Sequence, residues 1–440
     1  MVLSQVQLSG GGLGTERSAG APELPDPHSG ADRCPGALEV HRADDGGLVR
    51  VRVPGGLLAA TTLASVAAWA EELGNGRIEL TVRSNLQLRG IAPGAERELS
   101  ARLAAHGLLP SPAHDRARNV TASPLSGRDD LGAVDVRPLV ADLDARLCAT
   151  PDLARLPGRF LFALDDGRGD VAGMSADAGV LGLPDDRVAL LLAGLDTGLR
   201  LPLASAVAAL LEVASVFLRR RPDERTWRVA ELPGGPLSLL DDLAGPDGVG
   251  GSPGAVRVDP MVVPVPDDGS RVGRIVQADG RVALAVSVPL GELTPDRCRA
   301  LARTARHEVV LMAGRRVLLP DLAPEEVGEA EVALEAAGLI LDPGSPLLGV
   351  SACTGRPGCA KALADVRADA ALPPSAGQGQ ARGLPVHWSA CERRCGRPPG
   401  QVVDVVADPG GYQVLRDDQP VTAGADGARA HAVATRARYS

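Results

Sequence analysis

An internal duplication is the feature of this 440-residue chain that most constrains its fold, because two copies of one element order must form two similar units. The matched residues, given as the first copy and then the second, are Leu86, Leu88, Ile91, Ala105, Gly107, Leu108, Val120, Ala122 and Ser123, and Val317, Leu319, Leu322, Ala336, Gly338, Leu339, Val350, Ala352 and Cys353. The spacing is 231 residues for the first six pairs and 230 for the last three. This nearly constant spacing predicts two halves related by a pseudo-twofold axis.

The hydrophobic periodicity predicts the same elements in both copies. In the first copy we expect a strand at 48–53, a helix at 57–73, strands at 78–82 and 86–91, and a helix that ends near 107–109. In the second copy we expect a strand at 282–288, a helix at 295–306, strands at 309–312 and 317–319, and a helix at 324–337. Each copy continues into a further α/β segment, so the fold class is α+β.

Four of the seven cysteines lie within 43 residues, and their spacing predicts a metal centre. Cys353 and Cys359 form a C-x5-C motif in a loop that is rich in glycine and proline, and Cys391 and Cys395 form a C-x3-C motif. Two cysteines four residues apart on one helix face lie about 5–6 Å from each other. That distance is close to the separation of two corners of a cubane, so the motifs favour a 4Fe-4S cluster.

Other interpretations of these cysteines stay open at this point. Disulfides are disfavoured because no secretory signal is visible and the number of cysteines is odd. Zinc-binding pairs are usually separated by two to four residues, so a spacing of five is unusual for zinc. Unligated thiols are the third possibility. The remaining cysteines, Cys34, Cys148 and Cys298, follow no spacing pattern and are expected to be small buried residues.

Composition excludes a nucleic-acid binder and a membrane protein. The net charge of −9 disfavours contact with a phosphate backbone, and 2% aromatic residues cannot build base-stacking surfaces. The most apolar stretch, 201–218, contains Pro202 and Glu212, so we expect a buried helix rather than a membrane span. We therefore expect a cytoplasmic protein. All but one of the 46 basic residues are arginines, which bind carboxylates bidentately where they cluster.

Several motifs are together similar to those of the nitrite and sulfite reductase superfamily, and they extend from about Cys34 to Gly400. The cysteine pairs follow a duplicated unit that resembles the ferredoxin-like half-domain of that superfamily. The segment 81–90, Thr-Val-Arg-Ser-Asn-Leu-Gln-Leu-Arg-Gly, resembles its arginine-bearing strand pair, and 118–120 resembles its next anion-binding segment. The resemblance implies duplicated ferredoxin-like half-domains plus two α/β iron–sulfur/sirohaem-type domains related by a pseudo-twofold axis.

The duplication and the resemblance together divide the chain into six segments. We expect a disordered leader at 1–30, a first ferredoxin-like half-domain at 31–110, a first α/β, substrate-side domain at 111–250, a second ferredoxin-like half-domain at 251–343, a 4Fe-4S-binding domain at 344–420 and a flexible tail at 421–440. Cys353 corresponds to Ser123, so only one half has the metal ligands. A substrate site between the halves follows as a hypothesis.

The segment 156–167 discriminates among members of the superfamily. Nitrite and sulfite reductases have two basic residues here that bind a small oxyanion, whereas this chain has Arg159 and Leu161. Loss of one charge disfavours reduction of a small anion, because electrostatic stabilisation is usually the largest catalytic effect. The sequence Phe-Leu-Phe-Ala-Leu-Asp-Asp-Gly instead resembles precorrin-3B synthases, the cobalamin-pathway members of the superfamily.

This second resemblance implies an O2-dependent monooxygenase that hydroxylates the C20 carbon of precorrin-3A and closes a γ-lactone. It implies a 4Fe-4S cluster, held by Cys353, Cys359, Cys391 and Cys395, and a mononuclear non-haem iron. The electrons derive from NAD(P)H. Because the chain has no dinucleotide-binding fingerprint, we expect them to arrive through a reductase or a ferredoxin. The arginines expected to bind the carboxylates of the tetrapyrrole are Arg83, Arg89, Arg118, Arg128, Arg159 and Arg315.

Departures from the superfamily pattern concern the second cysteine motif. Relatives usually have glycine where this chain has Ala390 and Arg394, and the added charge is expected to raise the reduction potential of the cluster. His387 is expected either to orient a ligand or to have a structural role. None of the seven histidines forms the facial triad of a non-haem iron site, so the iron ligands are not predicted.

Two alternative functions are kept beside the monooxygenase. The first is a sirohaem-dependent nitrite or sulfite reductase, in which Cys395 would also bridge to the sirohaem iron. The second is a non-catalytic iron–sulfur or tetrapyrrole-binding protein. Leu161 favours the monooxygenase over the reductase, whereas Ala390 and Arg394 are compatible with the non-catalytic protein.

Overall fold

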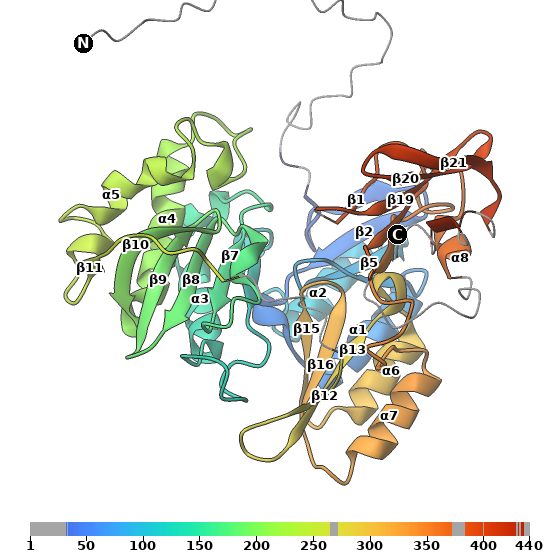
Figure 1. Cartoon of the computed structure of the whole chain (residues 1–440), viewed down its shortest axis with the longest axis horizontal. Helices are drawn as coiled ribbons and strands as arrows, with labels where there is room; N and C mark the ends of the chain where they lie inside the picture. The colour runs from blue at the N-terminus through green and yellow to red at the C-terminus, as the bar shows by residue number, and fades with distance from the viewer. Residues whose placement is uncertain are drawn as a thin grey trace, which may run out of the picture.

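The computed structural model describes residue 32 and residues 34–264, 272–371, 383–398, 400–427, 430 and 433–434. Four β-sheets organise these residues. Figure 1 shows the two ferredoxin-like half-domains beside each other, with one α/β domain on the left of the view and the other at the upper right. The leader expected at 1–30 lies outside the described residues.

The first ferredoxin-like half-domain is a five-stranded sheet covered by helices on one face. Its strand order is β1 (His41–Ala43), β2 (Gly46–Val51), β5 (Leu86–Ile91), β4 (Ile78–Leu80) and β14 (Glu292–Leu293). The helices are α1 (Ala60–Leu73) and α2 (Glu96–Ala105). In β5 and at the end of β2, apolar core residues alternate with the polar residues Arg50, Gln87 and Arg89, so one face of the sheet is apolar and the other is polar.

The second half-domain repeats this arrangement. Its strand order is β12 (Gly273–Val276), β13 (Val282–Ser287), β16 (Arg316–Leu322), β15 (Glu308–Met312) and β3 (Leu57–Ala59), and its helices are α6 (Pro295–Thr304) and α7 (Val327–Ala336). The halves exchange an edge strand: β3 of the first copy pairs with β15, and β14 of the second copy pairs with β4. One hydrophobic core therefore runs through both half-domains.

The substrate-side α/β domain contains a six-stranded sheet. Its strands are β6 (Val120–Ala122), β7 (Phe162–Asp165), β8 (Ala178–Leu183), β9 (Arg187–Leu192), β10 (Leu195–Pro202) and β11 (Val256–Arg257), with helices α3 (Arg137–Ala149), α4 (Ala206–Arg220) and α5 (Leu240–Ala244). The first three strands are parallel and the others are antiparallel. The predicted buried helix is α4, and among the described residues no helix has the length and apolar character needed to cross a membrane.

The other α/β domain has the same topology, which confirms the duplicated α+β fold. Its strands are β17 (Val350–Ala352), β18 (Val386–Ser389), β19 (Val403–Asp408), β20 (Gly411–Arg416) and β21 (Gln419–Ala425), and its helix is α8 (Val366–Ala370). Again the first three strands are parallel and the last two are antiparallel. In each of the two domains, the parallel strands end at the same edge of the sheet, so the loops that follow them can meet there.

Three sequence-based boundaries differ from the structure. The helix expected at 57–73 begins as strand β3, because residues 57–59 pair with β15. The substrate-side domain extends beyond 250, since β11 belongs to its sheet. The flexible tail expected from 421 begins within β21, which is hydrogen-bonded to β20.

Candidate active site

The cysteine motifs follow two adjacent parallel strands of the second α/β domain. Cys353 comes directly after β17, and Cys391 lies two residues after the end of β18. The backbone N–H of Cys353 donates to the carbonyl of Trp388 (2.9 Å), and the N–H of Ala390 donates to the Cys353 Sγ (3.2 Å). Parallel strands therefore bring the two loops together at the carboxyl edge of the sheet.

The four thiols are close enough to influence one another electrostatically. Burial raises the pKa of Cys353, and the neighbouring Cys391 and Cys359 raise it further. Burial also raises the pKa of Cys395, followed by the effects of Cys353 and Cys391. Thiols that resist ionisation beside one another are stabilised as thiolates when a metal binds them, so metal binding would release protons here.

The four cysteines supply the donor set of a metal centre. Within the described residues, no three cysteine sulfurs all lie within 4.8 Å of one another. Four thiols in two adjacent loops are the ligands that a 4Fe-4S cluster requires, so the residues present are compatible with such a cluster.

Two buried arginines fasten the first cysteine loop. Arg89, at the polar face of β5, donates to the carbonyl of Gly358 (3.0 Å) and forms a bidentate ion pair with Asp45. Arg367 of α8 donates through Nε to the carbonyl of Cys353 (3.2 Å). The loop between Cys353 and Cys359 is therefore held from the first half-domain as well as from its own domain.

The substrate-side domain has the pseudo-symmetric contact. Arg128 corresponds to Gly358 in the duplication, and Asp321 corresponds to Gly90, the neighbour of Arg89. Arg128 reaches from its loop to Asp321 (3.4 Å) and Glu308 (2.5 Å) of the second half-domain. In both halves an arginine joins a loop of the α/β domain to a ferredoxin-like sheet. Arg89 belongs to the sheet, whereas Arg128 belongs to the loop.

An ion-pair network holds the second cysteine loop. Arg394 has a φ of 45°, in the left-handed region where the glycine of relatives has no steric cost. Its guanidinium pairs with Asp418 (2.6 Å) and with the buried Asp404 (3.4 Å), and Arg397 pairs with Asp404 as well (2.9 Å). The charge of Arg394 is thus partly balanced by Asp418 and by Asp404, a carboxylate that Arg394 shares with Arg397.

The polar face of the first ferredoxin-like sheet forms the second part of the site. Arg50 of β2, Arg52 just after that strand, Gln87 and Arg89 of β5 and Glu79 of β4 alternate with core residues, so their side chains share one face. In the second half-domain the corresponding face is apolar and packs on Leu125. The charged centre of the first sheet face is thus replaced by apolar residues in the second sheet, where Glu308 and Asp321 lie near the strand ends and pair with Arg128.

Arg52 is a buried cation that has no carboxylate partner within the part of the chain that the structure describes. It is 2% exposed and donates to the side-chain oxygen of Asn119 (3.0 Å) and the carbonyl of Gly158 (2.8 Å). Burial, and then the charge of Arg50, lower the pKa of Arg52 to about 9. Its positive charge is thus destabilised, and an anion bound nearby would relieve that cost.

The six arginines predicted to bind substrate fall into two groups. Arg83, Arg159 and Arg315 have no carboxylate partner within the described residues. Arg83 donates to the carbonyl of Arg159 (3.0 Å), the exposed Arg159 lies over the ring of Trp227 at 4.5 Å, and Arg315 lies beside Gly396 of the second cysteine loop.

The other three are already paired inside the protein. Arg89 pairs with Asp45, Arg118 forms a bidentate pair with Asp144 (2.7 Å each), and Arg128 pairs with Glu308 and Asp321. We therefore leave them out of the substrate site. Arg50 and Arg52 lie on the polar sheet face without a carboxylate partner among the described residues, and sequence reasoning missed them although the alternation along β2 could have indicated them.

Leu161 lies in an apolar surrounding, where the superfamily pattern has a second cation. It is 1% exposed and packs with Ala163, Val171 and Ala176. An ionised lysine at this depth would lack a partner and would be costly. Leu161 is therefore a core residue of this domain and adds no charge to the segment 156–167.

His387 has a structural role in the described site. It is fully buried, its Nδ1 is 2.8 Å from the Ser351 hydroxyl, and its Nε2 is 3.2 Å from the carbonyl of Cys395. Burial, and then the charge of Arg315, lower the pKa of His387 to about 4. A neutral imidazole with both nitrogens engaged orients the Cys395 loop and offers no free metal ligand.

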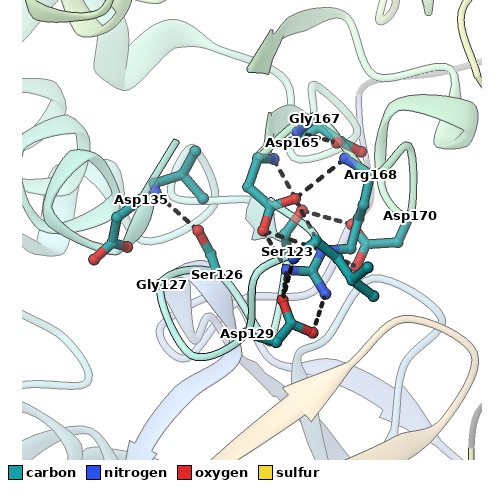
Figure 2. Close-up of polar contacts among 12 residues, drawn as sticks. Ser123, Ser126, Gly127, Asp129, Asp135, Asp165, Gly167, Arg168 and Asp170 are labelled. Atoms are coloured by element: carbon teal, nitrogen blue, oxygen red, sulfur yellow. Dashed lines mark hydrogen bonds and ion pairs between the residues drawn. The ribbon is translucent and has the colours of Figure 1, made fainter. Parts of the chain in front are cut away.

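One acidic cluster lies at the carboxyl end of β7, at the position equivalent to the cysteine edge. Figure 2 shows Asp165, Asp170 and Arg168 converging there beside Ser123. Asp165 accepts hydrogen bonds from the backbone N–H groups of Gly167, Gly169, Val171 and Ala172. Arg168 pairs with Asp166 (2.6 Å) and Asp129 (2.8 Å).

These contacts occupy the carboxylates that a metal would need. Asp165, Asp166 and Asp170 are the one group of three close metal-binding side chains among the described residues, and no histidine belongs to it. The residues described here therefore do not fit the mononuclear non-haem iron that the resemblance implied, and we assign it no ligands.

Asp170 gives this cluster a testable pH dependence. Burial, followed by the charge of Asp165, raises the pKa of Asp170 to about 7. The folded state holds this proton more tightly than the unfolded chain, so the stabilisation is complete below pH 4 and is lost as the pH rises through 7. Between pH 4 and 8 the wild type should lose on the order of 3 kcal/mol more unfolding free energy than Asp170→Asn, as measured by urea denaturation.

The matched control for this prediction is the exposed Asp142 of α3. Asp142→Asn should follow the wild-type curve, because its side chain is 50% exposed. If the unfolding free energies of Asp170→Asn and the wild type changed in parallel with pH, the raised pKa of Asp170 would be contradicted.

Comparison with known proteins supports the assignment of the first ferredoxin-like half-domain. Residues 40–106 match the family described as Nitrite/Sulfite reductase ferredoxin-like half domain. The findings support the placement of the chain in the nitrite and sulfite reductase superfamily that the motifs predicted, whose enzymes are oxidoreductases.

Individual relatives differ in how much of the chain they cover. The chain is 24% identical over 412 residues to a precorrin-3B synthase of Sinorhizobium sp., covering 87% of this chain and 82% of that protein. It is 34% identical over 127 residues to a ferredoxin–nitrite reductase of Synechococcus elongatus, covering 28% and 25%. The fold is similar to that of the Mycobacterium tuberculosis NirA protein, with a TM-score of 0.65 and 21% identity over 86% of this chain and 77% of that chain.

Proposed function

We propose that this protein is a precorrin-3B synthase-like monooxygenase that binds precorrin-3A on the polar face of the first ferredoxin-like sheet. In this reaction one atom of O2 becomes the hydroxyl group at C20 and the other leaves as water. Two electrons derived from NAD(P)H and two protons complete the balance. The ring A acetate then closes the γ-lactone.

The observation that carries the proposal is a group of arginines at this face that have no carboxylate partner among the described residues. Arg50, Arg52, Arg83 and Arg159 have no carboxylate partner within the described residues, and the lowered pKa of Arg52 marks the cost. Guanidinium groups in such a set bind carboxylates through charge-assisted bonds. The acetate and propionate groups of a tetrapyrrole supply several carboxylates at once.

The arginines and the cysteines have separate tasks in this proposal. Arg50, Arg83 and Arg159 bind and orient the macrocycle, and the buried Arg52 stabilises the nearby negative charge. Cys353, Cys359, Cys391 and Cys395 would hold the 4Fe-4S cluster, which supplies one-electron transfer when it is bound. Electrons would reach it from a ferredoxin or a separate reductase.

Leu161 is the feature that favours this function over a sirohaem-dependent nitrite or sulfite reductase. Its apolar surroundings leave Arg159 as the one cation of the discriminating pair. A small anion would lose a large part of its electrostatic stabilisation. A tetrapyrrole with several carboxylates depends less on that single charge.

The test is anaerobic purification followed by assay with precorrin-3A. The proposal expects iron–sulfur absorption without a chlorin band, and a product that forms only with O2. A sirohaem band with nitrite or sulfite reduction would establish the alternative, and a protein without iron that binds tetrapyrrole would indicate a non-catalytic binder.

A further inference from the structure

A continuous chain of hydrogen bonds joins the polar sheet face to the first cysteine loop. Arg50 Nη2 donates to Gln87 Oε1 (3.0 Å), and Gln87 Nε2 donates to Glu79 Oε2 (2.9 Å). Arg367 Nη2 donates to the other oxygen of Glu79 (3.0 Å), and Arg367 Nε donates to the carbonyl of Cys353 (3.2 Å). Five residues from five different segments thus connect a half-buried arginine to Cys353, one of the proposed cluster ligands.

Gln87 has a defined orientation in this chain. Its amide oxygen must face the guanidinium of Arg50, since that group only donates hydrogen bonds, and its NH2 must face the carboxylate of Glu79, which only accepts them. Neither neighbour tolerates the flipped amide. A ligand carboxylate that pairs with Arg50 neutralises the guanidinium to which the Gln87 oxygen is bound, so ligand binding changes the strength of this hydrogen bond.

Glu79 is the electrostatic centre of the chain. It is 7% exposed, and besides Arg367 it lies 3.3 Å from Arg77 Nε and 4.0 Å from Arg89 Nε. Arg89 itself holds the carbonyl of Gly358, next to Cys359. A change in how Glu79 is bound therefore reaches both arginines that fasten the first cysteine loop.

We propose that Gln87 and Glu79 are positioning residues that couple ligand binding at Arg50 to the reduction potential of the cluster. The proposal rests on the proposed function, since it takes the sheet face as the tetrapyrrole site and the four cysteines as cluster ligands. The reduced cluster is more negative than the oxidised one, so an anionic ligand binds the oxidised protein more tightly. By reciprocity, ligand binding lowers the potential.

The experiment uses the cluster-containing protein and uroporphyrin III, a stable tetrapyrrole with acetate and propionate groups. EPR-monitored redox titrations are run with and without saturating uroporphyrin III on the wild type, Gln87→Met and Glu292→Gln. Quenching of porphyrin fluorescence measures binding separately. Gln87→Met breaks the chain without changing charge. Glu292→Gln removes a carboxylate that pairs with Arg367 (3.4 Å) and Arg77 (3.7 Å) but leaves the chain intact.

In the wild type we expect the oxidised protein to bind the probe at least fivefold more tightly than the reduced protein. A tenfold ratio would appear as a fall of 59 mV in the one-electron potential. Glu292→Gln should keep this ratio, and Gln87→Met should reduce it below twofold while the probe still binds.

Two results would overturn the coupling while the proposed function stands: an unchanged ratio in Gln87→Met, which means that the charge acts through space, or a bound probe that leaves the wild-type potential unchanged. A wild type that binds no uroporphyrin III would instead overturn the tetrapyrrole site, and the coupling with it.

Discussion

Replacement of Cys391 by serine is expected to remove the iron–sulfur absorption and the acid-labile sulfide of the purified protein. Cys391 is half-buried at the carboxyl edge of β18, and its charge influences both Cys353 and Cys395. A serine hydroxyl remains protonated at neutral pH and is a poor substitute for a thiolate ligand. Iron and sulfide analysis, together with the visible spectrum of protein purified without oxygen, measures the loss.

Cys148 provides the matched control for this substitution. It lies on α3 of the substrate-side domain, and burial followed by the charge of Asp144 raises its thiol pKa. Cys148→Ser should keep the full iron and sulfide content. If Cys391→Ser also kept them, the assignment of the cluster ligands would be wrong.

Substitution of Arg83 by glutamine should weaken the binding of uroporphyrin III by about 10- to 100-fold. Arg83 is half-buried at the turn between β4 and β5, and it donates to one backbone carbonyl without pairing with a carboxylate of the described protein. A hydrogen bond between charged groups contributes about 1.5–3 kcal/mol, which sets this range. Fluorescence titration at fixed ionic strength gives the dissociation constants.

Arg118→Gln is the contrasting variant. Arg118 is 3% exposed and forms both of its short side-chain bonds to Asp144. Its removal leaves a carboxylate without its partner, so the free energy of unfolding should fall, while the affinity of the folded protein for the probe should stay the same. If Arg118→Gln weakened binding more than Arg83→Gln, our division of the arginines would be reversed.

The duplication predicted most of the architecture, because it is a pattern within the sequence. The exchange of β3 and β14 between the half-domains could not be predicted in this way. Residues 57–59 are two leucines and an alanine, which suit a helix, and their pairing with Glu308–Val310 is a contact between distant segments.

The ion-pair partners of the arginines also could not be predicted from local sequence patterns. Arg128 pairs with Glu308 and Asp321, which lie 180 and 193 residues away, so no local pattern could show that its charge is already used. Arg50 alternates with core residues in β2, and Arg52 continues this alternation just after the strand, so both resemble the solvent-facing side of an ordinary strand. Arg52 is buried because Gly158 and Asn119 of the substrate-side domain cover this end of the sheet, whereas Arg50 is half-buried.

The exchanged edge strands have a consequence for how such a molecule can be built. Neither copy completes its own five-stranded sheet, so a chain cut between the copies would leave each part with an open edge that matches the strand it lacks. Two such parts would satisfy those edges by associating, as in a domain-swapped homodimer. The present chain has the form of that dimer joined end to end, in which one copy kept the charged sheet face and the other kept the cysteines.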